Sequence, residues 1–268
     1  MKMHILVAGA AALALATGAT AATQKAYYGF NNTLAASVGG APALASVDPA
    51  SGNGYGSATV FGNNRTVFNF TGTNVPASEQ GGLSLDTTGL VSSSNYSVVM
   101  VVRFDGRDNE WRRLIDVQNR QSDQGFYVDF DNSLDVYPDF LGAPGSFATG
   151  VFQQVVMTNG GGFVSAYLNG GLVFSVSSSV MDIANLDNPG NAMNFFLDNN
   201  AGSFQDEWST GSVANIRLYD GVLSQGEVDK LWRDPFGAVP EPASWAMLVT
   251  GFGLTGAAIR QRRRRLTA

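Results

Sequence analysis

The chain contains no cysteine and only one histidine, His4. Without cysteine there can be no disulfide, no zinc–thiolate site and no thiol nucleophile. His4 lies in an N-terminal segment that we expect to be removed, so the mature chain would hold no imidazole. This excludes Ser-His-Asp and Cys-His catalysis and histidine metal ligands. Without disulfides, stability must come from a packed core. Without cysteine and histidine, the mature protein cannot use many common catalytic mechanisms.

Basic charge is scarce between the two ends of the chain. Residues 22–238 hold 21 acidic and 10 basic side chains, a formal charge of −11. Nucleic-acid binding requires a basic surface that displaces counterions, so we expect no nucleic-acid partner. An acidic exported domain more often meets cations or neutral glycans.

The N-terminus has the three parts of a secretion signal. Lys2 supplies a positive start, residues 5–16 are apolar, and Ala19-Thr20-Ala21 is a small-x-small cleavage site. This order predicts a signal peptide over residues 1–21, cut by signal peptidase.

The C-terminus predicts a membrane span. Residues 243–259 carry no charge, a length close to the ~17–25 residues that a transmembrane helix needs. A cluster of arginines follows, and such a cluster resists translocation and stays cytoplasmic. Both ends therefore place residues 22–238 outside the cytoplasm. The arginines of this cluster are Arg260, Arg262, Arg263, Arg264 and Arg265.

The middle of the chain is rich in glycine and in turn-forming residues, and its apolar residues follow strand periods. Residues 97–104 form an apolar run typical of a strand buried on both faces. Residues 126–130 alternate, with Phe126, Val128 and Phe130 on one face. A hairpin is predicted over 164–176 around Asn169-Gly170-Gly171. Residues 213–219 alternate again, with Ala214, Ile216 and Leu218 on one face and Val213, Asn215, Arg217 and Tyr219 on the other. The one expected helix begins at Ser224, with Glu227 at capping-box spacing.

In order, these segments resemble the laminin-G-like domains of the concanavalin type. The resemblance covers most of residues 26–236 and is most specific over residues 195–232. It departs from the pattern at Phe152-Gln153-Gln154, where many relatives carry tryptophan and histidine. The resemblance implies an all-β fold, a concanavalin-like jelly-roll β-sandwich of two antiparallel sheets over residues 22–238. An N-terminal signal helix and a C-terminal transmembrane helix would flank it.

Pro240-Glu241-Pro242 and then Trp245-Ala246 form a motif that leads into the apolar segment and the arginine cluster. In this order, residues 239–268 resemble the PEP-type sorting signals that exosortases recognise. The resemblance implies cleavage near the motif by an exosortase, in a Gram-negative bacterium that makes extracellular polysaccharide. An ordinary single-span anchor with a proline-rich hinge is the alternative. The motif residues are Pro240, Glu241, Pro242, Trp245 and Ala246.

Two sets of side chains are candidate sites. Asp198, Asn199, Asp206 and Glu207 are a candidate calcium site, because that cation takes six to eight oxygen ligands. Turn-forming residues of the same types are common on surfaces for backbone reasons, so an ordinary loop is the alternative. Three aromatic residues with polar neighbours are candidate sugar contacts, although each could equally be a half-buried strand residue. They are Trp111, Tyr137 and Trp208.

The sequence favours an exported binding or structural protein without catalytic activity. It would be secreted or held at the cell surface after transient anchoring in the inner membrane, and could recognise exopolysaccharide. One alternative is a glycoside hydrolase, which needs two facing carboxylates, and Asp129 and Asp131 are the only plausible pair on one strand. Another is a display domain that has no ligand.

Overall fold

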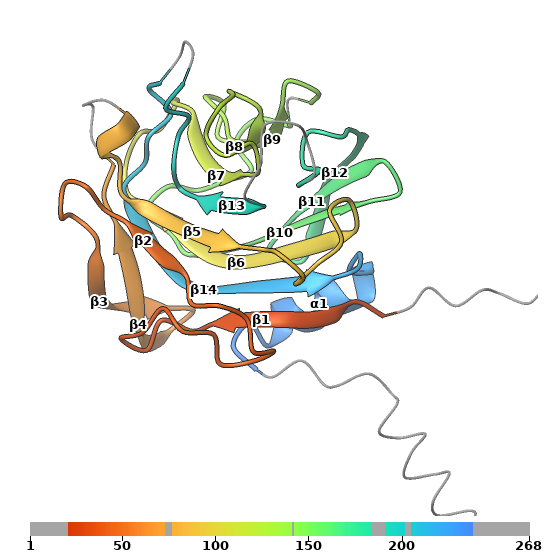
Figure 1. The fold of residues 1–268 in the computed structure, drawn as a ribbon, viewed down its shortest axis with the longest axis horizontal. Coiled ribbons are helices and arrows are strands. Elements are labelled where there is room, and N and C mark those ends of the chain that lie inside the picture. The colour runs from red at the N-terminus through yellow and green to blue at the C-terminus, as the bar shows by residue number, and fades with distance from the viewer. Residues whose placement is uncertain (1–20, 73–76, 141, 184–190, 202–204, 238–268) are drawn as a thin grey trace, which may run out of the picture.

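The computed structural model describes residues 21–72, 77–140, 142–183, 191–201 and 205–237. Two antiparallel sheets and one short α-helix make up this part of the chain (Figure 1). The expected signal peptide, apart from its last residue, lies outside the described residues. The expected tail 239–268, with its sorting motif and membrane span, lies outside them as well. Within the described ranges no helix is long and apolar enough to cross a membrane.

The larger sheet has eight strands. Its order is β12-β11-β10-β6-β14-β4-β3, and β1 pairs with β14 beside β4. The strands are β1 (Thr23–Tyr28), β3 (Gly54–Val60), β4 (Asn63–Phe70), β6 (Tyr96–Phe104), β10 (Gln153–Gly160), β11 (Phe163–Leu168), β12 (Gly171–Ser177) and β14 (Gly211–Asp220).

The smaller sheet has six strands in the order β2-β5-β13-β7-β8-β9. A short 3-10 helix, η1 (Ala77–Glu79), precedes β5. The strands are β2 (Ala45–Val47), β5 (Gly82–Asp86), β7 (Arg112–Asp116), β8 (Gly125–Val128), β9 (Leu134–Tyr137) and β13 (Ala192–Phe195).

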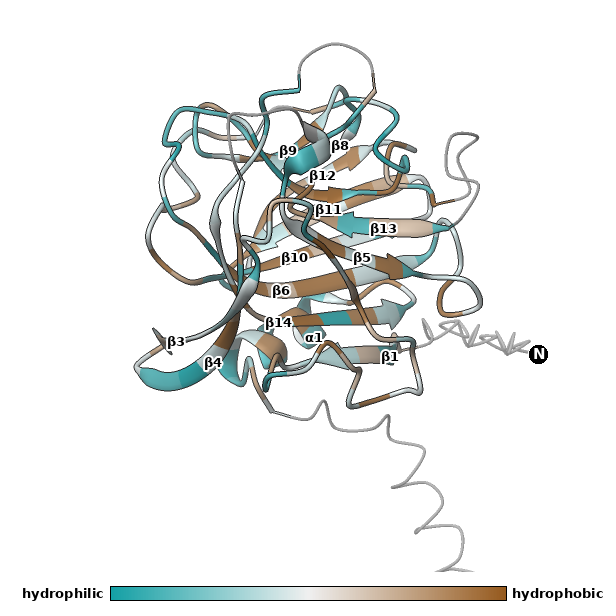
Figure 2. Ribbon diagram, turned by 60° about the vertical axis from the view of Figure 1, so that its left-hand side comes forward, coloured by the Kyte–Doolittle hydropathy of each residue, from teal (hydrophilic) through white to brown (hydrophobic). Residues whose placement is uncertain are grey.

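The main core lies between the two sheets, and β6 shows how the sequence builds it. Alternate residues of β6, including Met100 and Phe104, belong to this core. The intervening Val99 and Val101 face the other side and pack in two smaller clusters. The strand is therefore apolar on both faces, as predicted, and Figure 2 shows it as hydrophobic along most of its length.

The helix α1 (Gln225–Arg233) covers the outer face of the larger sheet. The backbone N–H of Ser224 donates to Glu227 Oε2 at 2.8 Å, so the predicted capping interaction is confirmed. Val228 and Leu231 of α1 pack on the apolar cluster that contains Val99.

Buried polar side chains hold the segment after α1 on the same face. Arg217 of β14 donates to the carbonyl oxygens of Pro235 at 2.8 Å and Gly237 at 2.9 Å. Asn215 also donates to the Pro235 carbonyl, at 2.8 Å. Gln154 of β10 donates to the Leu231 carbonyl at 2.9 Å. The described chain is therefore bound to the sheet up to its last residue.

Two sequence expectations about strand faces were wrong. β8 ends at Val128, and Phe130 lies beyond it with 44% of its surface exposed, because the hairpin turn already begins at residue 129. In β14 a bulge between Val213 and Asn215 shifts the alternation. Val213 therefore joins the main core, whereas Ala214 faces the outer side. The predicted hairpin is confirmed as β11 and β12.

Candidate functional site

The candidate site lies on the outer face of the smaller sheet, where an aspartate shapes each of two connections. Asp129 follows β8, and its carboxylate accepts the backbone N–H groups of Asp131 and Ser133, both at 2.9 Å. Asp116 ends β7 and accepts the N–H groups of Gln118 at 3.1 Å and Arg120 at 2.9 Å in the same spacing. Aspartates at strand ends often organise turns in this way. These turns fix where the neighbouring aromatic and charged residues emerge.

Three aromatic residues gather around Trp111, and we call Trp111, Tyr127, Phe130 and Tyr137 the aromatic patch. The ring of Trp111 lies 5.4 Å from Tyr127, 5.6 Å from Tyr137 and 6.0 Å from Phe130, measured between centroids. Tyr127 is fully buried, whereas Phe130 and Tyr137 are 44% and 36% exposed. Trp111 is half-buried. The patch is thus an exposed aromatic surface on a fixed aromatic base.

Two loops lie side by side next to the patch. Arg107 donates to the carboxylate of Glu110 at 3.0 Å and to the backbone carbonyl of Asp206 at 2.6 Å. Its guanidinium lies 4.0 Å from the ring centre of Trp208, a cation–π distance. This places partly exposed Trp208 on the loop that adjoins the start of β7.

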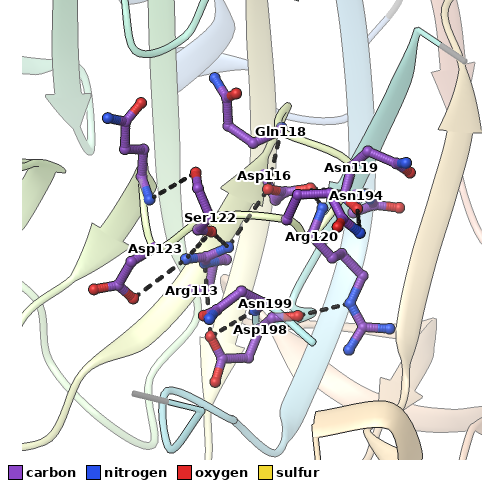
Figure 3. Close-up of polar contacts among 12 residues, drawn as sticks. Arg113, Asp116, Gln118, Asn119, Arg120, Ser122, Asp123, Asn194, Asp198 and Asn199 are labelled. Carbon is purple, nitrogen blue, oxygen red and sulfur yellow. Dashed lines mark hydrogen bonds and ion pairs between the residues drawn. The ribbon is translucent and has the colours of Figure 1, made fainter. Parts of the chain in front are cut away.

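Arg113 lies at the centre of a buried polar network that supports the patch (Figure 3). Its guanidinium donates to the Tyr127 hydroxyl and to the Ser122 carbonyl, the latter at 3.1 Å. The Tyr127 hydroxyl in turn donates to the Asp123 carbonyl at 2.7 Å. Arg113 therefore fixes the base of the patch to the loop between β7 and β8.

The same guanidinium faces several carboxyl groups. It lies 3.4 Å from Asp116, 3.4 Å from Glu207 and 4.0 Å from Asp198. Burial raises the pKa of Glu207 to about 10, although Arg113 acts to lower it and Asp198 raises it further. Burial also raises the pKa of Asp198, again against the effect of Arg113. Burial thus favours the protonated form of Glu207, which reduces the negative charge around Arg113.

The predicted calcium ligands divide between this network and the surface. Asp198 and Asn199 are buried, and the Asp198 carboxylate accepts the backbone N–H groups of Asn199 at 2.7 Å and Glu207 at 2.9 Å. Asp206 is exposed. In the described ranges no group of three or more His, Cys, Asp or Glu residues is arranged to hold a metal ion. Arg113 supplies the positive charge beside these carboxyl groups, and calcium binding stays a prediction of the sequence.

Asp135 is a second buried acid beneath the patch. It stands opposite Tyr127 in the β8–β9 pairing and two residues before Tyr137, so all three share one face of the hairpin. It is 0% exposed, and neither carboxyl oxygen has a hydrogen-bond partner among the described residues. Burial, with the nearby charge of Asp129, raises the pKa of Asp135 to about 8. At neutral pH it is mostly uncharged.

The predicted hydrolase pair does not form. Both oxygens of Asp129 hold the turn, since Oδ2 also accepts from the Ser133 hydroxyl at 2.8 Å. Asp131 is exposed and follows the end of β8, so the two residues do not share a strand. This arrangement provides no facing pair of free carboxylates at these positions.

The sequence matches a family model described as the concanavalin A-like lectin/glucanases superfamily, over residues 76–229. The chain belongs to this superfamily. The matched range contains the whole aromatic patch and the Arg113 network. No curated protein matches the sequence.

Solved structures share the superfamily fold. Domain 4 of AbnA, a GH43 extracellular arabinanase from Geobacillus stearothermophilus in complex with arabinotriose, is 19% identical with a TM-score of 0.55; the match covers 79% of this chain and 98% of that one. A structure of botulinum neurotoxin type C, whose cell entry is described as dependent on interaction with two ganglioside molecules, is 13% identical with a TM-score of 0.54; the match covers 79% of this chain and 51% of that one. A binding domain of botulinum neurotoxin DC, in complex with rat synaptotagmin II, is 12% identical with a TM-score of 0.53. That match covers 79% of this chain and 51% of the toxin chain. The chain therefore spans about half of these toxin chains, and such identities show the fold alone.

Within this superfamily fold, two of the three predicted sugar contacts, Trp111 and Tyr137, lie together. Trp208 lies on the adjoining loop, with its own partner in Arg107. Phe130 was not among the predicted sugar contacts, because its alternation with Phe126 and Val128 is typical of a strand residue. The signal that could have placed it is Asp129 followed by Asp131-Asn132, a turn-forming series.

Proposed function

We propose that this chain is an exported carbohydrate-binding module of the concanavalin A-like superfamily, which binds polysaccharide at the aromatic patch without cleaving it. The observation that carries the proposal is the exposure of Phe130 and Tyr137 on the fixed base of Trp111 and Tyr127. Exposed aromatic rings in a cluster are uncommon on a protein that has no ligand to cover them.

The ring geometry favours a sugar over a caged ammonium group. An aromatic cage needs space between its rings, but the ring centroids of Tyr127, Tyr137 and Phe130 lie only 5.4 to 6.0 Å from that of Trp111, so Trp111 contacts all three. The outward faces therefore offer apolar surface against which the C–H face of a pyranose or furanose ring can pack.

The ligands of two of the similar structures support a carbohydrate ligand for this chain. One is described as a complex with arabinotriose and the other concerns interaction with gangliosides. Both ligands contain carbohydrate. This is support from likeness of fold, and the patch residues of this chain supply the specific argument.

The proposal includes export, signal cleavage and sorting. The support is the order of segments in the sequence: a signal peptide over 1–21, the Pro240-Glu241-Pro242 motif, the apolar stretch 243–259 and the arginine cluster. We propose processing by signal peptidase and an exosortase in a Gram-negative bacterium, leaving the module at the cell surface or in the matrix. Replacing the three motif residues by alanine should leave the tail on the protein, which mass spectrometry of the envelope fraction would detect.

The two ends of the described chain suit such an arrangement. In both ribbon views β8 and β9 lie at the top of the molecule, whereas β1 and α1 lie at the bottom (Figures 1 and 2). A chain attached through its C-terminal tail would thus present the patch away from the attachment point.

The binding test is a panel of neutral polysaccharides run against the wild-type domain and the Trp111→Ala and Tyr137→Ala variants. Affinity electrophoresis should show retardation of the wild type and at least a tenfold weaker effect for either variant. Leu172→Ala is a matched control, because Leu172 is 55% exposed and lies on β12 in the other sheet. Equal retardation of all variants would exclude the patch as the binding site. Release of reducing sugar by the wild type would contradict the non-catalytic role.

A further inference from the structure

Near the aromatic patch, the carboxylates are exposed, whereas the arginines are buried or paired. Four exposed carboxylates stand close to its rings along the chain: Asp108, Glu110, Asp131 and Asp139. Glu110 directly precedes Trp111, Asp131 directly follows Phe130, and Asp139 lies two residues after Tyr137. Phe130 and Tyr137, the two exposed rings of the patch, therefore each have an exposed carboxylate close by in the chain, whereas Glu110 beside Trp111 is paired with Arg107 at 3.0 Å.

The nearby positive charges are occupied. Arg112 and Arg113 are fully buried. Arg112 donates to the Thr149 hydroxyl at 2.9 Å and to the Asn132 side chain, and Arg113 belongs to the buried network. Arg107 is paired with Glu110 at 3.0 Å and lies over Trp208. None of these three guanidinium groups is therefore free to receive an anionic sugar at the patch.

We propose that the aromatic patch selects uncharged polysaccharide and rejects polysaccharide that bears carboxylate, sulfate or phosphate groups. This inference rests on the proposed function and names its ligand class. Like charges placed around a binding surface exclude the wrong partner more than they strengthen binding to the right one. The exposed carboxylates act in this way, while the rings provide the contact.

The test compares neutral polymers with their own charged derivatives. Arabinan, galactan, dextran and a β-1,4-glucan are each tested beside a carboxymethylated form of the same polymer, with the whole exported domain. We expect binding to at least one neutral polymer and at least tenfold weaker binding to its carboxymethylated form. The difference should shrink at 0.5 M salt, because salt screens charges at exposed sites.

A charge-removed variant makes the test specific. In Asp108→Asn/Asp131→Asn/Asp139→Asn the ring residues are untouched, so binding to the neutral polymer should be unchanged and binding to the carboxymethylated form should rise at least threefold. The matched control removes three carboxylates that lie at β1 and α1: Asp220 pairs with Thr23 of β1, Asp229 lies on α1, and Asp234 follows α1. Figure 1 shows β1 and α1 on the side of the molecule opposite β8 and β9. This control is Asp220→Asn/Asp229→Asn/Asp234→Asn, and it should not restore binding.

The outcomes separate the two proposals. If wild type binds a neutral polymer through Trp111 but binds the carboxymethylated form equally well, or prefers an amine-bearing glycan at physiological salt, the charge selection is wrong and the binding function stands. If no polymer is bound, or if Trp111→Ala binds like wild type, the proposed function fails and the inference fails with it.

Discussion

Removing the carboxyl group of Asp135 should stabilise the domain at alkaline pH and change little at acid pH. In the unfolded chain this carboxyl group has its ordinary pKa of 3.8, whereas in the folded domain burial raises its pKa to about 8. Between these values the folded state binds more protons than the unfolded state, so the free energy of unfolding falls as pH rises. In Asp135→Asn this contribution is absent.

The size of the effect follows from the same two values. One pKa unit corresponds to about 1.4 kcal/mol, so the rise from 3.8 to about 8 sets an upper limit of about 6 kcal/mol. Opening of the β8–β9 hairpin to water lowers the cost of the charge. We therefore expect the variant to gain at least ~2 kcal/mol over wild type at pH 8.5 and less than ~0.5 kcal/mol at pH 4.

Urea unfolding followed by tryptophan fluorescence measures this difference across the pH range. Asp131→Asn is the control, because Asp131 belongs to the same hairpin but is exposed. Its difference from wild type should stay small and nearly constant. A gain for Asp135→Asn that is the same at pH 4 and pH 8.5 would show that the effect comes from packing and that the buried carboxyl is not the cause.

Two further changes test the architecture around the site. Arg113→Met leaves the buried carboxyl groups of Asp198 and Glu207 without their cation. The free energy of unfolding in urea should fall by about 3–5 kcal/mol, and by more at high pH than at low pH. A fall below ~1 kcal/mol would mean that the network does not depend on this charge. Gly211→Ala would place a Cβ 2.1 Å from a backbone oxygen of β6 and should cost about 2 kcal/mol or more. Gly54→Ala, with nothing within 4 Å of its Cβ, should stay within ~0.5 kcal/mol of wild type, and equal losses for both would refute the steric explanation.

Much of the fold could be predicted because its signals are local. The run 97–104 has the composition of a strand with apolar neighbours on both sides, and β6 lies between the main core and the smaller outer clusters. Asn169 and Gly170 have positive φ values of 50° and 85°, as the hairpin motif predicts. Ser224 and Glu227 form their capping interaction within a few residues.

The errors arise where a backbone irregularity interrupts a period. One inserted residue at the bulge in β14 reverses which side Ala214 faces, and no feature of residues 213–219 marks the bulge. Phe130 was assigned to a strand because it continued the alternation of Phe126 and Val128. Asp129 instead forms a turn by accepting the backbone N–H of Asp131, so the strand ends before Phe130.

The candidate site could be predicted only in part because its members come from distant segments. Trp111 and Tyr137 were recognised singly from their polar neighbours, yet their contact depends on β7, β8 and β9 lying next to one another. The role of Arg113 could not be read from the sequence. Its partner Asp116 lies on β7, whereas Asp198 and Glu207 follow β13 much later in the sequence. These residues meet only because β13 pairs with β7.

The hydrogen bonds from Arg217 and Asn215 to the segment after α1 have a mechanical consequence. A force applied at the C-terminal end of the described chain acts first on these bonds to Pro235 and Gly237, and next on the apolar contacts of α1. Only after both have yielded does the load reach β14, which is paired on both sides within the larger sheet. In a molecule attached through its C-terminus and exposed to flow, the contacts of α1 and of the segment after it would therefore break first. The aromatic patch at the opposite end would keep its structure.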